Sequence, residues 1–127
     1  MTDLHIPRHW RYRLLGVLDA PTYPENLRLL DAWQKAEGGT AQYNPLNTTY
    51  KLDGSWNYNT VGVQNYRTAL DGICATAITI QFSYYEHIWT DLKAGVKTAE
   101  EIVNDNWSAF QTWGTNPQTI LDVLKTT

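Results

Sequence analysis

The polar stretch from residue 38 to residue 66 constrains the fold of this chain more than any other feature. It reads GGTAQYNPLNTTYKLDGSWNYNTVGVQNY, is rich in Asn and Tyr, and has no helical periodicity. A loop of this length without structure of its own is uncommon inside a compact domain. The stretch is therefore functional, disordered or built around short strands, and its segment SWNYNTVGV offers a pair of short strands.

A helical pattern leads into this polar stretch. Residues 25–37 (ENLRLLDAWQKAE) place Leu30, Trp33 and Glu37 on one face, and a Gly-Gly pair ends the pattern. Partial burial and nearby helix carbonyl groups both raise the pKa of a carboxyl group, so we expect Glu37 to titrate above an ordinary glutamate. The alternative, from the residues alone, is a solvated acid in the last helical turn.

Helical patterns also follow the polar stretch. Residues 75–83 (ATAITIQFS) alternate in the manner of a strand, but apolar residues from Ala69 onward recur at spacings of three or four, which favours a helix. Three later helices are predicted from their end signals, which are Gly95 as a stop, Thr98 with Glu101 as a capping box, and Asn116 with Pro117 as a start. The sequence therefore predicts a mainly α fold.

Length and composition narrow the organisation of the chain. A chain of 127 residues is long enough for one hydrophobic core, so we expect a single domain over residues 1–127. Within it, residues 1–23 are predicted as an N-terminal arm or short helix, and residues 25–127 as the core. The single Cys74 lies in an apolar run and has no partner for an internal disulfide, so a buried thiol is expected.

Charge and hydropathy argue against several partners and locations. A formal net charge of -3 does not recruit nucleic acid or an anionic membrane. The N-terminal residues lack the basic flank and apolar run of a secretory signal, and no stretch approaches the roughly 18 apolar residues of a membrane span. We therefore expect a soluble chain without a signal peptide.

One group of potential metal ligands lies near the N-terminus. Asp3, His5 and His9 are close in sequence, but the chain has only three histidines and no second cluster of ligands. The expectation is therefore no metal and no cofactor.

The run from Trp33 to Tyr66 resembles the lysozyme-like superfamily of peptidoglycan-cleaving muramidases and lytic transglycosylases. In that superfamily the catalytic Glu ends a helix and is followed closely by Gly-Gly, as Glu37 is here, and a short Gly-Leu-Met-Gln type of motif follows later. Gly62, Val63, Gln64 and Asn65 stand in the place of that motif. The late Ala-Tyr-Asn motif of transglycosylases is absent.

Three further segments look like those of one branch, found in actinobacteriophage tail proteins and endolysins. They are NPLNTT, NYNTVGVQNY and the later WGT, which is Trp113, Gly114 and Thr115. The resemblance implies a lysozyme-like single domain, with a long polar loop or small β-hairpin between the catalytic helix and the next helix. It also implies a phage setting, either in the virion or in the host cytoplasm before release to the cell wall, with other virion proteins as further partners.

The resemblance implies cleavage of the bond between N-acetylmuramic acid and N-acetylglucosamine, with Glu37 as general acid. Asp53 is the one candidate for a second carboxylate, and Asp-Gly is also a plain turn signal. Hydrolysis and internal cyclisation by the muramic 6-hydroxyl both stay open. The candidate contacts to peptidoglycan glycan strands are Gln64, Asn65, Tyr66, Tyr43, Asn47, Tyr58 and Trp56.

A non-catalytic reading competes with the enzyme. The same sequence suits a virion structural or glycan-binding module that keeps the lysozyme-like fold, because the second acid and the late tyrosine motif are missing. Glycoside hydrolase, lytic transglycosylase and binding module are therefore the main alternatives that the sequence leaves, and a toxin-like or regulatory helical domain unrelated to sugar is a further one.

Overall fold

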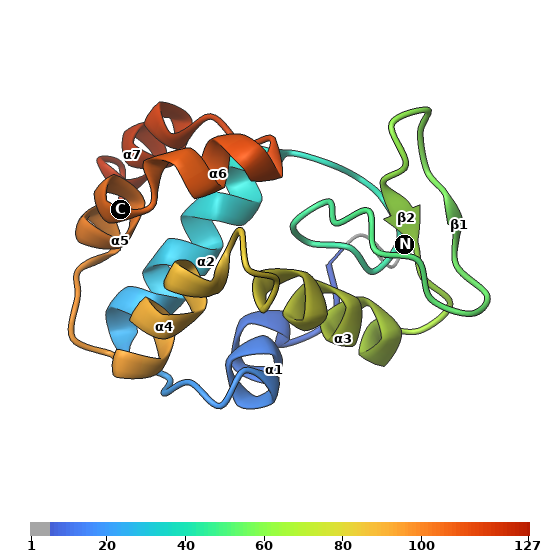
Figure 1. Ribbon diagram of the computed structural model, residues 1–127, viewed down its shortest axis with the longest axis horizontal. Coiled ribbons are helices and arrows are strands. Elements are labelled where there is room, and N and C mark those ends of the chain that lie inside the picture. Colours follow the sequence, from blue (N-terminus) through green and yellow to red (C-terminus); the bar gives the residue numbers. More distant parts are fainter. Residues whose placement is uncertain (1–5) are drawn as a thin grey trace.

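A computed structural model describes residues 6–127, so Asp3 and His5 of the N-terminal metal set lie outside the described residues. The predicted mainly α class is confirmed, with a small hairpin between the second and third helices (Figure 1). The described part of the chain forms seven helices, which are α1 (Trp10–Val17), α2 (Pro24–Glu37), α3 (Ala69–Ile80), α4 (Glu86–Ala94), α5 (Ala99–Asp105), α6 (Trp107–Trp113) and α7 (Pro117–Leu124). The strands β1 (Trp56–Asn57) and β2 (Gln64–Asn65) pair antiparallel, with Trp56 opposite Asn65.

Helix α2 has the face that the sequence predicts. Leu30 and Trp33 are fully buried, and Glu37 is half-buried at the C-terminal end of the same face. Gly38 adopts the left-handed conformation, with φ 61°, and its N–H donates to Gln34 O at 3.1 Å. A glycine at this position carries no Cβ penalty for positive φ, so the chain leaves the helix directly after the acid.

The ambiguous segment after residue 68 is helical, which agrees with the spacing rather than with the strand-like alternation. Thr68 caps α3 by accepting from the Asp71 N–H at 3.1 Å. The threonines within α3 fit a helix because their hydroxyl groups donate hydrogen bonds to backbone carbonyl groups one turn earlier. Thr76 donates to Gly72 O and Thr79 donates to Ala75 O, each at 2.8 Å.

The segment after the predicted capping box forms two helices instead of one continuous helix. The capping box of Thr98 and Glu101 is present, but the helix breaks at Asn106. The Asn106 amide donates to Asp91 Oδ2 at 2.9 Å and to Ile102 O at 2.8 Å, and Asp91 belongs to α4. An amide held by a neighbouring helix therefore turns the chain between α5 and α6.

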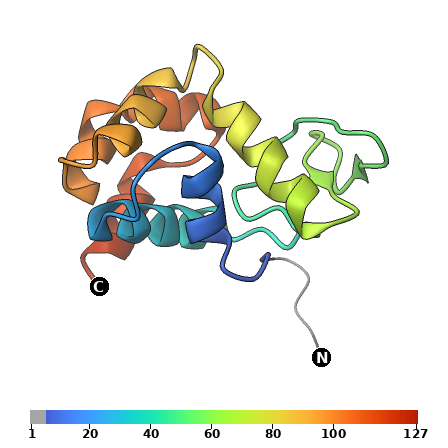
Figure 2. The same cartoon turned by 90° about the horizontal axis from the view of Figure 1, so that it is seen from below.

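The core lies around α2, which runs through the helical body, while the hairpin lies at the other end of the molecule (Figures 1 and 2). In both views α3 stands between the two parts. The N-terminal segment forms a short helix that joins this core, since Trp10, Leu14 and Leu15 belong to the same buried cluster as Trp33. Within residues 6–127, no helix combines the length and the apolar character that crossing a bilayer requires.

Candidate active site at the end of α2

Among the carboxyl groups of residues 6–127, Glu37 is the one with a large upward pKa shift. Burial raises the pKa of Glu37 from an ordinary 4.5 to about 7, and a hydrogen bond from Thr115 acts in the opposite direction. The direction agrees with the expectation from sequence, and burial is the main cause. A carboxyl group with a pKa about 7 is still substantially protonated near neutral pH and can act as a general acid.

Thr115 reaches Glu37 from the far end of the chain. Its hydroxyl group lies 3.2 Å from Glu37 Oε2 and 3.1 Å from Trp33 Nε1. The local sequence explains this position, because Gly114 ends α6 with φ 102° and the Thr115 N–H donates to Phe110 O at 3.0 Å. These are the contacts of a Schellman helix end, and they turn Thr115 back toward α2.

Aromatic side chains pack beside the acid. Trp33 meets both Phe110 and Trp113 edge-on, with ring centroids 4.9 Å apart in each pair, and Trp113 meets Tyr85 at the same distance. The Trp113 Nε1–H donates to Leu46 O at 2.7 Å, which ties α6 to the polar stretch. Edge-on aromatic pairs stabilise the packing beyond the area that they bury, so this cluster holds α6 and Tyr85 against Trp33 of α2.

Asn47 lies close behind the glycine pair. It has a left-handed backbone, with φ 58°, and its Oδ1 is buried without a hydrogen-bond partner. A Cβ on Gly39 would overlap the Asn47 amide group, so a larger residue at that position would require the Asn47 side chain to move. A cavity of about 40 Å³, large enough for a water molecule, is lined by Asn47, Thr48, Thr49, Thr79, Tyr85 and Trp113.

The predicted sugar contacts at Gln64, Asn65 and Tyr66 point into the fold. Gln64 is buried and accepts from Ser55 Oγ, and it donates to Asn57 Oδ1 and to Gly62 O. Asn65 Oδ1 accepts from the Gln42 N–H at 2.8 Å. Tyr66 is fully buried, its hydroxyl donates to Tyr50 O, and burial raises its pKa. These three side chains therefore hold the polar stretch together.

The other predicted aromatic contacts are more open. Trp56 and Tyr58 on the hairpin are 48% and 43% exposed, and the Tyr58 hydroxyl hydrogen-bonds the Thr40 hydroxyl, which lies three residues after Glu37. Tyr43 is half-buried with φ 55°, and its carbonyl group packs against Gly72 of α3. The hairpin therefore approaches the chain beside the acid through Tyr58.

Asp53 occupies an exposed turn. Gly54 follows it with φ 81°, and Ser55 closes the turn through its N–H, which donates to Leu52 O at 2.9 Å. Gly54 also faces the Arg67 side chain just before α3, whereas Glu37 contacts the connection between α6 and α7. The geometry at Asp53 is that of the turn signal in its sequence.

Thr115 is the contact of Glu37 to which the sequence gave no role. The available signal was the order Trp-Gly-Thr-Asn-Pro, in which a helix stop directly precedes a helix start. Such a junction predicts a rigid residue between two helices. It does not predict what that residue touches.

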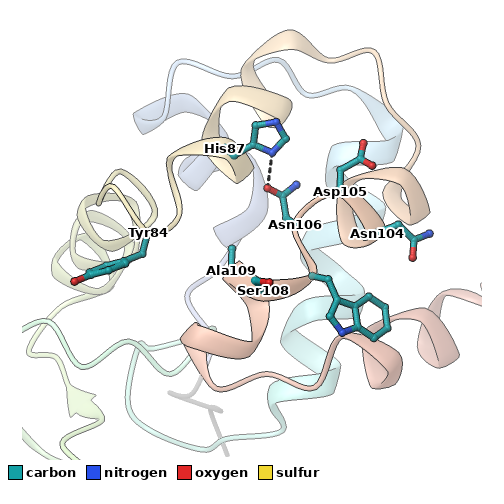
Figure 3. Close-up of a pocket in the computed structure, with 8 residues that line it drawn as sticks. Tyr84, His87, Asn104, Asp105, Asn106, Ser108 and Ala109 are labelled. Atoms are coloured by element: carbon teal, nitrogen blue, oxygen red, sulfur yellow. Dashed lines mark hydrogen bonds between the residues drawn. The ribbon is translucent and has the colours of Figure 1, made fainter.

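A second hollow of about 410 Å³ lies between α4 and the junction of α5 and α6 (Figure 3). At its edge His87 Nδ1 is 2.7 Å from Asn106 Oδ1. Tyr84 is 74% exposed here, while Tyr85 is buried. Tyr84 and Asn104 point away from each other in Figure 3, so the polar groups of this hollow do not converge on one ligand position.

The structure offers little to a metal ion. In the part of the chain that is described, no group of three or more His, Cys, Asp or Glu side chains is arranged to hold a metal. Cys74 is a free thiol and is half-buried, so it is less enclosed than the sequence suggested.

Comparisons of the chain with protein-family models, with curated proteins and with solved structures give no match. The fold and the site therefore define the class by themselves. It is a mainly α protein in which a half-buried, readily protonated glutamate ends the central helix.

Proposed function

We propose that the protein cleaves the glycan strand of peptidoglycan between N-acetylmuramic acid and N-acetylglucosamine, with Glu37 as general acid. The observation that carries the proposal is the pKa of Glu37, which burial raises to about 7 at the end of α2. A glycosidic oxygen is a poor leaving group until it is protonated, so the reaction needs an acid that keeps its proton near neutral pH. The resemblance of the sequence around Glu37 to lysozyme-like enzymes supports the same role.

The proposed fold is the lysozyme-like one. A mainly α body, with a small hairpin after the helix that carries the acid, is compatible with it. Fold alone does not define an activity, so the proposal rests on Glu37 and its surroundings.

The proposed reaction begins with proton transfer from Glu37 to the glycosidic oxygen. Positive charge then develops on the muramic acid ring, and either a water molecule or the 6-hydroxyl group of the same sugar completes the reaction. Asp53 lies in an exposed turn, which makes it a weak candidate for a second carboxylate. We therefore propose a mechanism that depends on a single carboxyl group, with either outcome.

For the substrate contacts we favour the exposed aromatic faces of Tyr58 and Trp56 on the hairpin. The Asn47 amide oxygen has no hydrogen-bond partner, but it is buried and is not open to a substrate. Gln64, Asn65 and Tyr66 act in this proposal by holding the polar stretch in shape. The proposed setting is a phage particle or lysis system, with the bacterial cell wall as target and other virion proteins as further partners.

The test is zymography on purified cell wall with the wild type and the Glu37→Gln variant. We expect clearing by the wild type and none by Glu37→Gln, because the amide cannot donate the proton that the leaving group needs. Glu86→Gln, which neutralises an exposed acid at the start of α4, is the matched control and should clear like the wild type. Clearing that survives Glu37→Gln contradicts the mechanism.

A non-catalytic glycan-binding or virion structural module is the second candidate. The exposed position of Asp53 favours this module, because Asp53 would then not serve as the second acid of a glycosidase. In this case the wild type would bind cell wall without clearing it. Muropeptide mass spectrometry of any cleared sample would distinguish anhydro ends from reducing ends.

A further inference from the structure

The hydrogen bonds around Thr115 have a defined direction. The indole Nε1 of Trp33 is a donor only, so the Thr115 hydroxyl oxygen accepts from it over 3.1 Å. Within residues 6–127, the acceptor found for the Thr115 hydroxyl hydrogen is Glu37 Oε2, at 3.2 Å. The three groups therefore form a chain in which Trp33 donates to Thr115 and Thr115 donates to Glu37.

We infer that Thr115 and Trp33 are positioning residues that keep Oε2 of Glu37 as an acceptor and direct the acidic proton to Oε1. In a protonated carboxyl group the carbonyl oxygen is the better acceptor, so the oxygen that receives the Thr115 hydrogen is the one without the proton. The inference rests on the proposed function in one respect only. If Glu37 is the general acid, Oε1 is the oxygen that faces the leaving group. The hydrogen-bond chain itself is independent of any activity.

The position of Thr115 is fixed from both sides. Its N–H is held by the last turn of α6, and the next residue, Asn116, caps α7 by accepting from the Gln118 N–H at 2.9 Å. Thr115 is 4% exposed and Trp33 is fully buried. A hydroxyl group held between two helix ends loses little further freedom when it orients a carboxyl group, which is the requirement for a precise catalytic geometry.

The hydroxyl group of Thr115 is the main polar group that affects the titration of Glu37. Residues 38–50, which follow Glu37 in the chain, and residues 106–121, which include its partner Thr115, contain no Asp, Glu, Lys, Arg or His. On α2 itself, Lys35 pairs with Asp31 at 3.0 Å. No ion pair reaches Glu37 within the described chain, and burial and the Thr115 hydrogen bond oppose each other there.

The test is an NMR titration of the Glu37 side-chain carboxyl carbon in the wild type and four variants. Thr115→Val removes the hydroxyl and keeps the shape, so the midpoint of Glu37 should rise by roughly one pH unit. Thr115→Ser restores the donor and should return the midpoint to that of the wild type. Trp33→Phe removes the N–H that polarises Thr115 and should raise the midpoint by a smaller amount. Thr112→Val removes an exposed hydroxyl from α6, three residues before Thr115, and should change nothing.

An unchanged or lowered midpoint in Thr115→Val overturns the inference. If Thr115→Val does not fold, as judged by circular dichroism, an unchanged or lowered midpoint in Trp33→Phe overturns the inference instead. A merely structural role for Thr115 would lower stability in Thr115→Val without moving the titration. The titration needs no substrate, so the two proposals are judged separately. It can support the inference about Thr115 although the wild type clears no cell wall, and it can overturn that inference although Glu37→Gln abolishes clearing.

Discussion

At the scale of single residues, the site depends on a balance of two effects on one carboxyl group. Burial against the aromatic cluster disfavours the charged form of Glu37, and the Thr115 hydroxyl favours it. Burial is the larger effect, so the folded protein holds the proton more tightly than the unfolded chain does. The folding free energy therefore depends on pH through this residue.

The sign of that dependence follows from the two pKa values. The pKa of Glu37 is 4.5 in the unfolded chain and about 7 in the folded protein. Between these two pH values the unfolded state binds fewer protons than the folded state, so the free energy of unfolding falls as the pH rises. We expect Glu37 to cost up to about 3 kcal/mol above this window and nothing below it. Urea unfolding at about pH 4 and about pH 9 measures the cost.

Glu37→Gln should remove this part of the pH dependence. The variant should match the wild type in acid and exceed its free energy of unfolding in base, because the buried amide has no charge to desolvate. Glu86→Gln should follow the wild type at both pH values. Parallel profiles for Glu37→Gln and the wild type would show that the carboxyl group is not desolvated.

At the scale of elements, α3 and the polar stretch pack together at one glycine. A Cβ on Gly72 would overlap the carbonyl oxygen of Tyr43, and that oxygen belongs to the backbone and cannot rotate away. Tyr43 itself has a positive φ. The approach of helix to loop therefore needs a residue without a side chain.

We expect Gly72→Ala to destabilise the protein by about 2 kcal/mol or more, because the helix must move away from the loop. Gly16→Ala is the matched control, since it makes the same change in a helix where nothing lies within 4 Å. That variant should be neutral or gain roughly 0.5–1 kcal/mol from the better helix propensity of alanine. Equal effects of the two changes, measured by thermal or urea unfolding, would contradict the close contact.

Element ends were predictable where a signal and its effect lie within one helical turn. The Gly38 stop, the Thr98 capping box and the Asn116 cap are all in the structure. The break at Asn106 was not predictable, because its amide is held by Asp91 from another helix. The sequence around Asn106 looks like a continuous helix until that partner is known.

At the scale of the whole molecule, the two ends of the structure differ in how many of their side chains are buried. The core gathers around α2, whereas most side chains from residue 51 to residue 62 are exposed and the strands are two residues long. Two-stranded hairpins contribute little stability of their own. The hairpin is therefore the part that should open first.

Hydrogen exchange followed by mass spectrometry tests this expectation. Amide hydrogens of residues 51–62 should exchange by local opening, and those in the buried centre of α2 only at the rate of global unfolding. The segment around Gln64 and Tyr66 serves as an internal control, because its buried side chains should protect it. Protection of residues 51–62 equal to that of α2 would show that the hairpin is part of the cooperative core.

The sequence by itself determined the helices, most of their ends and the placement of Glu37 on an apolar face, because these depend on residues within one or two turns of each other. Tertiary structure alone decided which polar groups Glu37 meets and which side-chain amides are occupied by partners. Thr115 is 78 residues away from Glu37, and Gln64 is occupied by partners that only the folded hairpin supplies. Burial and long-range hydrogen bonds depend on which distant segments pack together, and no local pattern in the sequence encodes that choice.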